Sequence, residues 1–117
     1  MERVLGIGGL FLRARDPDVL GAWYRDVLGL DGGERGLWEQ ELGPTVLATF
    51  PADTDYFGPG AQNIMLNFRV RDLDAMLAQL RAAGAEVADD VQDMDGVGRF
   101  AWVTDPEGNR IELWQPA

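Results

Sequence analysis

The residue types that carry most enzyme chemistry are missing from this chain, which contains no histidine, lysine, cysteine or serine. Their absence excludes thiolate and serine nucleophiles, Schiff-base chemistry, and metal sites built from thiolates or imidazoles. Carboxylates and two tyrosines remain as candidates for proton transfer. Tyr24 has the spacing of a helix stripe, whereas Tyr56 lies in a Pro- and Gly-rich connector from which it could close a cleft.

Aromatic residues form the second group of candidates. Trp38, Trp102, Trp114 and Phe11 are able to stack on a flat ligand or to contact a cation. The alternative is that these rings pack within a sheet or along a dimer seam. The number of tryptophans, four in a chain of 117 residues, favours contact with a ligand. Trp23 is excluded from this group because it has helix spacing and is expected in the core.

Acidic residues outnumber basic ones by 20 to 10, which gives a net charge of −10. This charge disfavours nucleic acid and anionic membranes as partners and attracts cationic ligands; the alternative is that it only serves solubility. No apolar run approaches the roughly 20 residues of a membrane span, and no N-terminal signal segment is visible, so we expect a cytoplasmic protein. The acidic cluster at residues 89–95 lacks the spacing of a calcium loop and is expected to be a solvated loop.

An internal repeat indicates the architecture. An offset of 56 residues aligns two segments, which run from Arg13 to Arg25 and from Arg69 to Arg81. The identical pairs are Arg13/Arg69, Arg15/Arg71, Asp16/Asp72, Asp18/Asp74, Ala22/Ala78 and Arg25/Arg81. A glycine follows each segment, so each half is predicted to begin with a strand, a helix and a glycine stop.

Both predicted helices have a cap and one apolar stripe. Asp16 is a good N-cap before Pro17, and Asp72 is the equivalent cap in the second half. Apolar residues at helical spacing follow each cap; they are Leu20, Trp23, Tyr24, Val27 and Leu28, then Leu73, Met76, Leu77 and Leu80. These stripes are expected to face the core and not a cofactor.

Extended runs flank each helix and are predicted to be strands. They are residues 7–14, 37–42 and 46–50 in the first half, and 63–70, 86–88, 99–104 and 110–114 in the second. The composition of residues 105–109 predicts a hairpin turn. If helices cover one face of a sheet, alternate strand residues face away from them. On this basis the outward residues include Gly9, Phe11, Arg13, Met65, Asn67, Arg69, Phe100, Trp102, Thr104, Glu112 and Trp114.

Two stretches resemble the two halves of the vicinal-oxygen-chelate superfamily: LRARDPDVLGAWYRDVLGL, and FRVRDLDAMLAQLRAAGAEV with FAWVTDPEGNRIELWQP. This superfamily includes glyoxalase I, extradiol dioxygenases, fosfomycin-resistance enzymes and bleomycin-resistance proteins. The resemblance covers nearly the whole chain and implies an α+β fold in which two βαβββ modules form a curved, mixed sheet with a cleft. It places the helices on the convex side and implies a homodimer. We expect one domain, with module one at about residues 1–51, a connector at about 51–62, and module two at about 63–117.

Metal-dependent members of the superfamily hold their ligands on the first and last strand of each module. The resemblance maps those positions onto Gly9, Leu47, Met65 and Glu112. Among them only Glu112 can bind a hard cation, whereas a catalytic metal site needs about three protein ligands. We therefore predict no metal and no cofactor. Glu112 is then either a ligand-binding carboxylate or general base, or a structural glutamate paired with an arginine. Candidates for that pairing are Arg13, Arg69 and Arg110.

The predicted function is metal-independent binding of a small planar or cationic organic compound, as in bleomycin-resistance proteins. One alternative is a lyase or isomerase that uses Glu112 as a general base. Another is a protein whose own side chains fill the cleft and which acts through partner contacts. The predicted ligand-binding residues are Phe11, Arg13, Trp38, Leu47, Met65, Asn67, Arg69, Phe100, Trp102, Glu112 and Trp114, and Glu112 is also the catalytic candidate.

Overall fold

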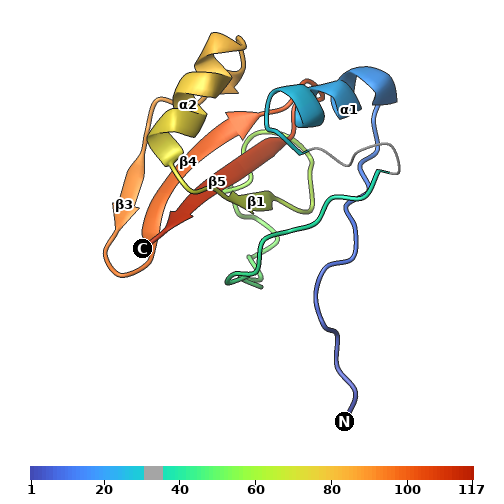
Figure 1. Ribbon diagram of the computed structural model, residues 1–117, viewed down its shortest axis with the longest axis vertical. Helices are drawn as coiled ribbons and strands as arrows, with labels where there is room; N and C mark the ends of the chain where they lie inside the picture. The colour runs from blue at the N-terminus through green and yellow to red at the C-terminus, as the bar shows by residue number, and fades with distance from the viewer. Residues whose placement is uncertain (31–35) are drawn as a thin grey trace.

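The computed structural model describes residues 1–30 and 36–117. Within them, two helices, α1 (Pro17–Asp26) and α2 (Leu73–Ala82), lie on one side of a five-stranded mixed sheet (Figure 1). The predicted α+β fold class is confirmed. Neither of these helices has the length and apolar character needed to cross a lipid bilayer.

The second half of the chain supplies every strand of the described residues. The strands are β1 (Leu66–Arg69), β2 (Glu86–Val87), β3 (Gln92–Met94), β4 (Gly98–Thr104) and β5 (Arg110–Pro116). β5 pairs in parallel with β1 and antiparallel with β4, and β4 also pairs with β2 and β3. This order, a strand followed by a helix and further strands, is the order that the sequence predicts for the second half.

Residues 89–95 are exposed, as predicted for a solvated acidic segment, but Gln92–Met94 form strand β3 and not a loop. Asp93 lies opposite Arg99 of β4 in the antiparallel register, and Arg99 Nε donates a hydrogen bond to Asp93 Oδ1 at 3.1 Å. A pair of opposite charges on neighbouring strands stabilises the pairing and offsets the low strand propensity of aspartate.

The helices begin where the sequence predicts. Asp16 Oδ1 accepts a hydrogen bond from the backbone N–H of Val19 at 3.2 Å, and Asp72 Oδ1 accepts one from Ala75 at 3.0 Å. Gly84 follows α2 with φ of +76°, a left-handed conformation that favours glycine at a helix end.

The core lies between the two helices and one face of β4 and β5. Its buried residues are Leu20, Tyr24 and Leu28 from the first helical segment, Leu73, Leu77 and Leu80 from α2, and Ala101, Val103, Ile111 and Leu113 from the sheet. Because side chains alternate along a strand, the residues between the last four point to the opposite face.

The structure differs from the prediction in the first half. Residues 7–14, 37–42 and 46–50, all described, contain no strand. Figure 1 shows the N-terminal segment leaving the rest of the molecule, and the side chains of Phe11 and Leu47 are 97% and 94% exposed. An extended segment needs a neighbouring strand to bond its N–H and C=O groups, and in this single chain these segments have none.

Candidate functional site

The candidate site lies on the sheet face opposite the helices, which we call the open face. At its centre is Glu112 of β5, whose neighbours Ile111 and Leu113 are in the core. Glu112 lies in register with Trp102 of β4 on one side and with Asn67 of β1 on the other. Although it faces away from the core, Glu112 is only 7% exposed, so other side chains cover it.

Three side chains of the described residues donate hydrogen bonds to the Glu112 carboxylate. The Tyr56 hydroxyl and Trp102 Nε1 both donate to Oε2, the indole at 3.0 Å, and Asn67 Nδ2 donates to Oε1 at 2.7 Å. A buried carboxylate is costly unless donors compensate for the lost water. These donors are neutral, and they anchor the carboxylate between β1, β4 and the connector.

The suggestion that an arginine pairs with Glu112 is wrong for the described residues, whose ion pairs do not include Glu112. Arg13 is exposed, and Arg69 Nη2 donates instead to the backbone oxygen of Glu41 at 2.8 Å. The guanidinium carbon of Arg110 lies 5.1 Å from the centre of the Trp102 ring. Three neutral donors therefore bond the carboxylate, and no arginine of the described residues forms an ion pair with it.

Tyr56 covers the carboxylate from the connector. Its ring stacks on Phe50 with centroids 5.3 Å apart and meets Trp102 edge-to-face at 6.2 Å. Burial, and then the hydrogen bond to Glu112, raise the pKa of Tyr56 to about 12. The phenol therefore stays protonated at neutral pH and acts as a hydrogen-bond donor.

A hollow of about 470 Å³ adjoins this cluster at Trp102, and we call it the Trp102 hollow. Its lining residues are Pro59, Glu86, Val87, Ala88, Asp89, Trp102, Thr104, Gly108 and Arg110. Arg110 Nε is buried and has no hydrogen-bond partner among the described residues. Trp102 thus connects the hollow with the Glu112 carboxylate.

Two more aromatic residues extend the open face along the sheet. Phe100 and Trp114 are in register on β4 and β5, and their rings stack with centroids 6.0 Å apart and an interplanar angle of 2°. Trp114 Nε1 donates to the backbone oxygen of Val97 at 3.0 Å, which fixes the indole. These rings pack on one another beside Glu112, where Trp114 is buried and Phe100 is half-buried.

The structure brings together only part of the predicted ligand-binding set. Asn67, Arg69, Phe100, Trp102, Glu112 and Trp114 share the open face. Phe11, Arg13 and Leu47 lie on exposed segments that form no strand of the sheet, and Met65 is half-buried just before β1. Trp38 contacts Phe68, whose ring packs against the core, at 6.2 Å, so it lies on the helix side of β1.

Three residues in or beside the cluster, Phe50, Tyr56 and Arg110, are absent from the predicted ligand-binding set. The sequence indicated Tyr56 only as a candidate for proton transfer in a connector that could close a cleft. The signal for Arg110 was its alternation with Glu112 along one strand, because residues two apart on a strand share a face.

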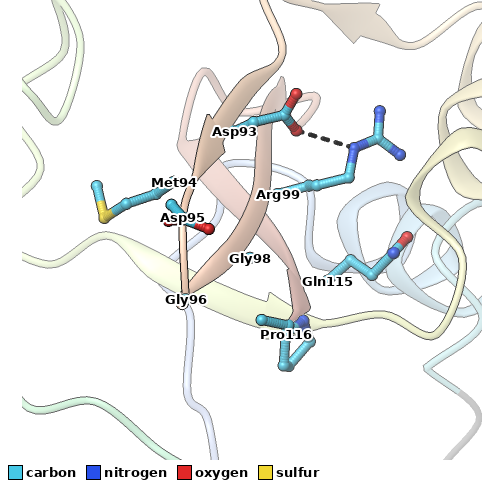
Figure 2. A pocket seen from close by; sticks show the side chains of 9 residues that line it. Asp93, Met94, Asp95, Gly96, Gly98, Arg99, Gln115 and Pro116 are labelled. Atoms are coloured by element: carbon cyan, nitrogen blue, oxygen red, sulfur yellow. Dashed lines mark hydrogen bonds and ion pairs between the residues drawn. The ribbon is translucent and has the colours of Figure 1, made fainter.

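A second hollow, of about 530 Å³, lies at the β3–β4 hairpin and the end of β5 (Figure 2). It is lined by Asp93, Met94, Asp95, Gly96, Gly98, Arg99, Gln115, Pro116 and Ala117. Figure 2 shows the ion pair of Asp93 and Arg99 on one side of it. Its lining includes neither Glu112 nor the donors around it, and it contains no aromatic ring, so we place the candidate site at Glu112.

The superfamily includes metal-dependent members, but the residues around Glu112 do not fit a catalytic metal. Trp102 Nε1 and Asn67 Nδ2 reach the carboxylate as N–H donors, and such groups do not ligate cations. In the part of the chain that the structure describes, histidine, cysteine, aspartate and glutamate form no cluster of three that could hold a metal ion. We derive no reaction step through a metal.

Comparison with curated proteins finds relatives in mycobacteria. The chain is 32% identical over 108 residues to CFP32, which has glyoxylase in its name, in Mycobacterium tuberculosis (strain CDC 1551 / Oshkosh) and in Mycobacterium bovis. The match covers 86% of this chain but only 40% of each relative, so this chain spans about two fifths of their length.

Solved structures share the fold over the whole chain. TnmS3, an antibiotic binding protein from Streptomyces sp. CB03234, is 25% identical, with a TM-score of 0.62 and coverage of 99% of this chain and 100% of its own. The fosfomycin resistance protein FosX from Listeria monocytogenes is 15% identical, with a TM-score of 0.67 and coverage of 98% and 96%. A glyoxylase/bleomycin resistance protein/dioxygenase domain from Frankia sp. EAN1pec is 18% identical, with a TM-score of 0.63 and coverage of 98% and 100%.

The sequence itself matches the Glyoxalase-like domain over residues 9–114, which is most of the chain. The match includes both helices and all five strands down to Trp114 of β5. The chain therefore belongs to the Glyoxalase-like domain family, and its fold is similar to that of solved members of the glyoxalase/bleomycin resistance protein/dioxygenase superfamily.

Proposed function

We propose that this protein binds a planar or cationic small organic molecule on the open face of its sheet, without a metal. The observation that carries the proposal is a nearly buried carboxylate, Glu112, set among aromatic rings. Shape, ring contact and one fixed charge are sufficient to bind such a ligand, and no reactive group is required.

Two further observations support this function. The net charge of −10 attracts cations toward the molecule. The similar protein TnmS3 is described as antibiotic binding, so the same fold is used for small-molecule binding elsewhere.

Thermal denaturation with matched pairs of planar aromatic compounds tests the proposal. One member of each pair bears a cationic amine and the other a neutral group of the same size. A ligand at 100 times its Kd stabilises the folded state by about 2.7 kcal/mol, so the cationic member should raise Tm clearly more than its neutral partner. The difference should shrink in Glu112→Gln. A broad panel in which no compound raises Tm would refute the proposal.

The same variant separates binding from catalysis. Oε2 of Glu112 accepts two hydrogen bonds, from Tyr56 and Trp102, whereas Oε1 accepts one, from Asn67. A general base would have to use the remaining acceptor position on Oε1. Turnover that disappears in Glu112→Gln while binding persists would favour a lyase or isomerase over a binding protein.

We infer that the functional unit is a homodimer. The accessible surface of the chain is 9009 Å², whereas a folded monomer of 12.9 kDa has about 6,300 Å². If each of two copies buried this excess of about 2,700 Å², the interface would total about 5,400 Å², which is the size of a large obligate interface. Large apolar side chains of the first half contribute to this exposed surface; they are Val4, Leu5, Ile7, Phe11, Leu37, Leu42, Val46 and Leu47.

A second copy of this chain is the occupant that best fits these segments. By the internal repeat, residues 7–14 correspond to residues 63–70, which contain β1, so they are suited to the same kind of strand pairing. The charges of the two parts are opposite. Residues 1–15 contain three arginines and one glutamate and are positively charged, whereas the rest of the chain contains seven arginines and nineteen acidic residues and is negatively charged. We therefore propose that module one completes its strands against the partner copy.

Sedimentation measures this association. We expect a dimer for the unmodified chain and a shift toward monomer for Phe11→Asp. Val19→Asp is the matched control, since Val19 is an exposed apolar residue of α1 outside these segments, and it should leave the dimer intact. A monomeric unmodified chain at micromolar concentration would contradict the inference.

A further inference from the structure

Tyr56 occupies a slot on the open face whose walls have the chemistry of a binding site for an aromatic ring. Phe50 stacks against one face of the phenol with an interplanar angle of 15°, and Trp102 meets it at 87°. At the end of the slot, the Glu112 carboxylate accepts a hydrogen bond from the Tyr56 hydroxyl. Two aromatic walls and a terminal acceptor thus surround one phenol ring.

The phenol reaches this slot from a loop, not from the sheet. Short turns shape the loop: Thr54 N–H donates to the backbone oxygen of Pro51 at 3.1 Å, and Gly58 N–H donates to that of Asp55 at 3.0 Å. Tyr56 N–H donates to Thr54 Oγ1 at 3.2 Å. Between Pro51 and Gly58 the loop is otherwise held by these local bonds, and it is attached to the sheet again at Gln62, whose side chain bonds the backbone N–H and C=O of Arg110. Displacing residues 51–58 leaves these two bonds and the strand pairing in place, and loops of this kind open at lower free energy than the core.

We propose that Tyr56 is a displaceable internal ligand, and that the molecule bound by this protein takes its place. This inference rests on the proposed function and narrows its ligand class. The ligand carries a planar ring of about the size of a phenol and, at its edge, an O–H or N–H group that donates to Glu112. Tyr56 then acts as a specificity-determining residue, because a ligand must replace both its ring contacts and its hydrogen bond.

The Trp102 hollow supports this assignment. It shares Trp102 with the slot, and Pro59, three residues after Tyr56, contributes to its lining. When the phenol leaves, the slot and the hollow both border the same indole. A ligand larger than phenol would therefore extend along Trp102 toward Arg110, whose buried Nε lacks an acceptor among the described residues.

Tyr56→Ala tests the proposal with p-cresol, which is the side chain that the substitution removes. We expect p-cresol to raise the Tm of Tyr56→Ala by several degrees, and toluene, which has the same shape without the hydroxyl, to raise it far less. The unmodified chain should respond weakly, because its slot is filled. In the double variant Tyr56→Ala, Glu112→Leu the preference for p-cresol over toluene should disappear. Equal responses to the two compounds, or an equal response of the unmodified chain, would overturn the proposal.

Tyr56→Phe provides a second measurement if the alanine variant does not fold. Phenylalanine keeps the ring contacts but loses the hydrogen bond to Glu112, so the slot should open more readily. We expect p-cresol to bind Tyr56→Phe about tenfold more tightly than the unmodified chain in an NMR titration. Equal affinities would contradict displacement. Because p-cresol replaces the unknown ligand, this result is independent of the compound panel that tests the proposed function.

Discussion

Replacing Glu112 by leucine removes the acceptor that three donors share, and it should destabilise the fold by about 2–4 kcal/mol. Trp102 is 3% exposed, so its indole N–H would be left buried without a partner, at a cost of about 1–3 kcal/mol. Tyr56 is half-buried and would lose a hydrogen bond to a charged group, but its hydroxyl would regain some contact with water. The net loss of stability from Tyr56 is therefore about 1 kcal/mol. Asn67 is exposed and returns to water at little cost.

Glu112→Gln is the matched variant, and it should stay within about 1 kcal/mol of the unmodified chain. The glutamine oxygen can take the place of Oε2 and accept from Tyr56 and Trp102. Its amide nitrogen then faces Asn67, whose side-chain amide can turn to offer its oxygen. The weaker bonds to a neutral acceptor are offset because no charge is buried.

Urea denaturation followed by circular dichroism measures both variants at one protein concentration, because association would otherwise change the midpoint. At about 4 °C per kcal/mol, Glu112→Leu should also lower Tm by about 8–16 °C. If leucine and glutamine variants unfold at the same midpoint as the unmodified chain, the carboxylate is not anchored by these donors. Equal losses in both variants would show that the charge, and not the acceptor, matters.

Two further predictions concern alkaline pH and strand geometry. Burial and the bond to Glu112 raise the pKa of Tyr56 from 10 to about 12, so its contribution to stability is complete below pH 10 and disappears as pH rises through 12. The free energy of unfolding of Tyr56→Phe should therefore vary less over this range, and parallel profiles would contradict the prediction. Gly98 has φ of +139°, and a Cβ there would lie 2.2 Å from the backbone oxygen of Gln115, so Gly98→Ala should cost more than about 3 kcal/mol. A native urea midpoint for Gly98→Ala would show that β4 and β5 pair differently.

The sequence predicts well the features that depend on local spacing. Caps at Asp16 and Asp72 locate both helices, because each carboxylate bonds a backbone N–H three residues ahead. Alternation along β4 and β5 correctly separates Trp102 and Glu112 from the core, since the side-chain period of a strand is two. Such rules need no knowledge of distant contacts.

Contacts across the chain were harder to predict. The partners of Glu112 come from β1, β4 and a loop. No local pattern in the sequence indicates that Tyr56, 56 residues away, bonds the carboxylate and that an arginine does not. The prediction of strands in the first half is wrong for another reason. A strand is stable only beside another strand, and the alternation of Leu10 and Leu12 with Phe11 and Arg13 does not show which strand will pair with this segment.

The turn between β4 and β5 holds α1 at two points. Glu107 accepts bonds from the backbone N–H groups of Arg15 and Asp16, at 2.9 and 3.2 Å, and the buried Asp105 accepts the Tyr24 hydroxyl at 2.8 Å. Neither attachment depends on the exposed residues 36–50 that follow in the chain. In the monomer that Phe11→Asp is expected to give, a protease that cuts there should leave a nicked molecule whose two fragments stay together until denaturant separates them. The same site would accept a split of the gene, with the two halves produced apart and reassembled on mixing.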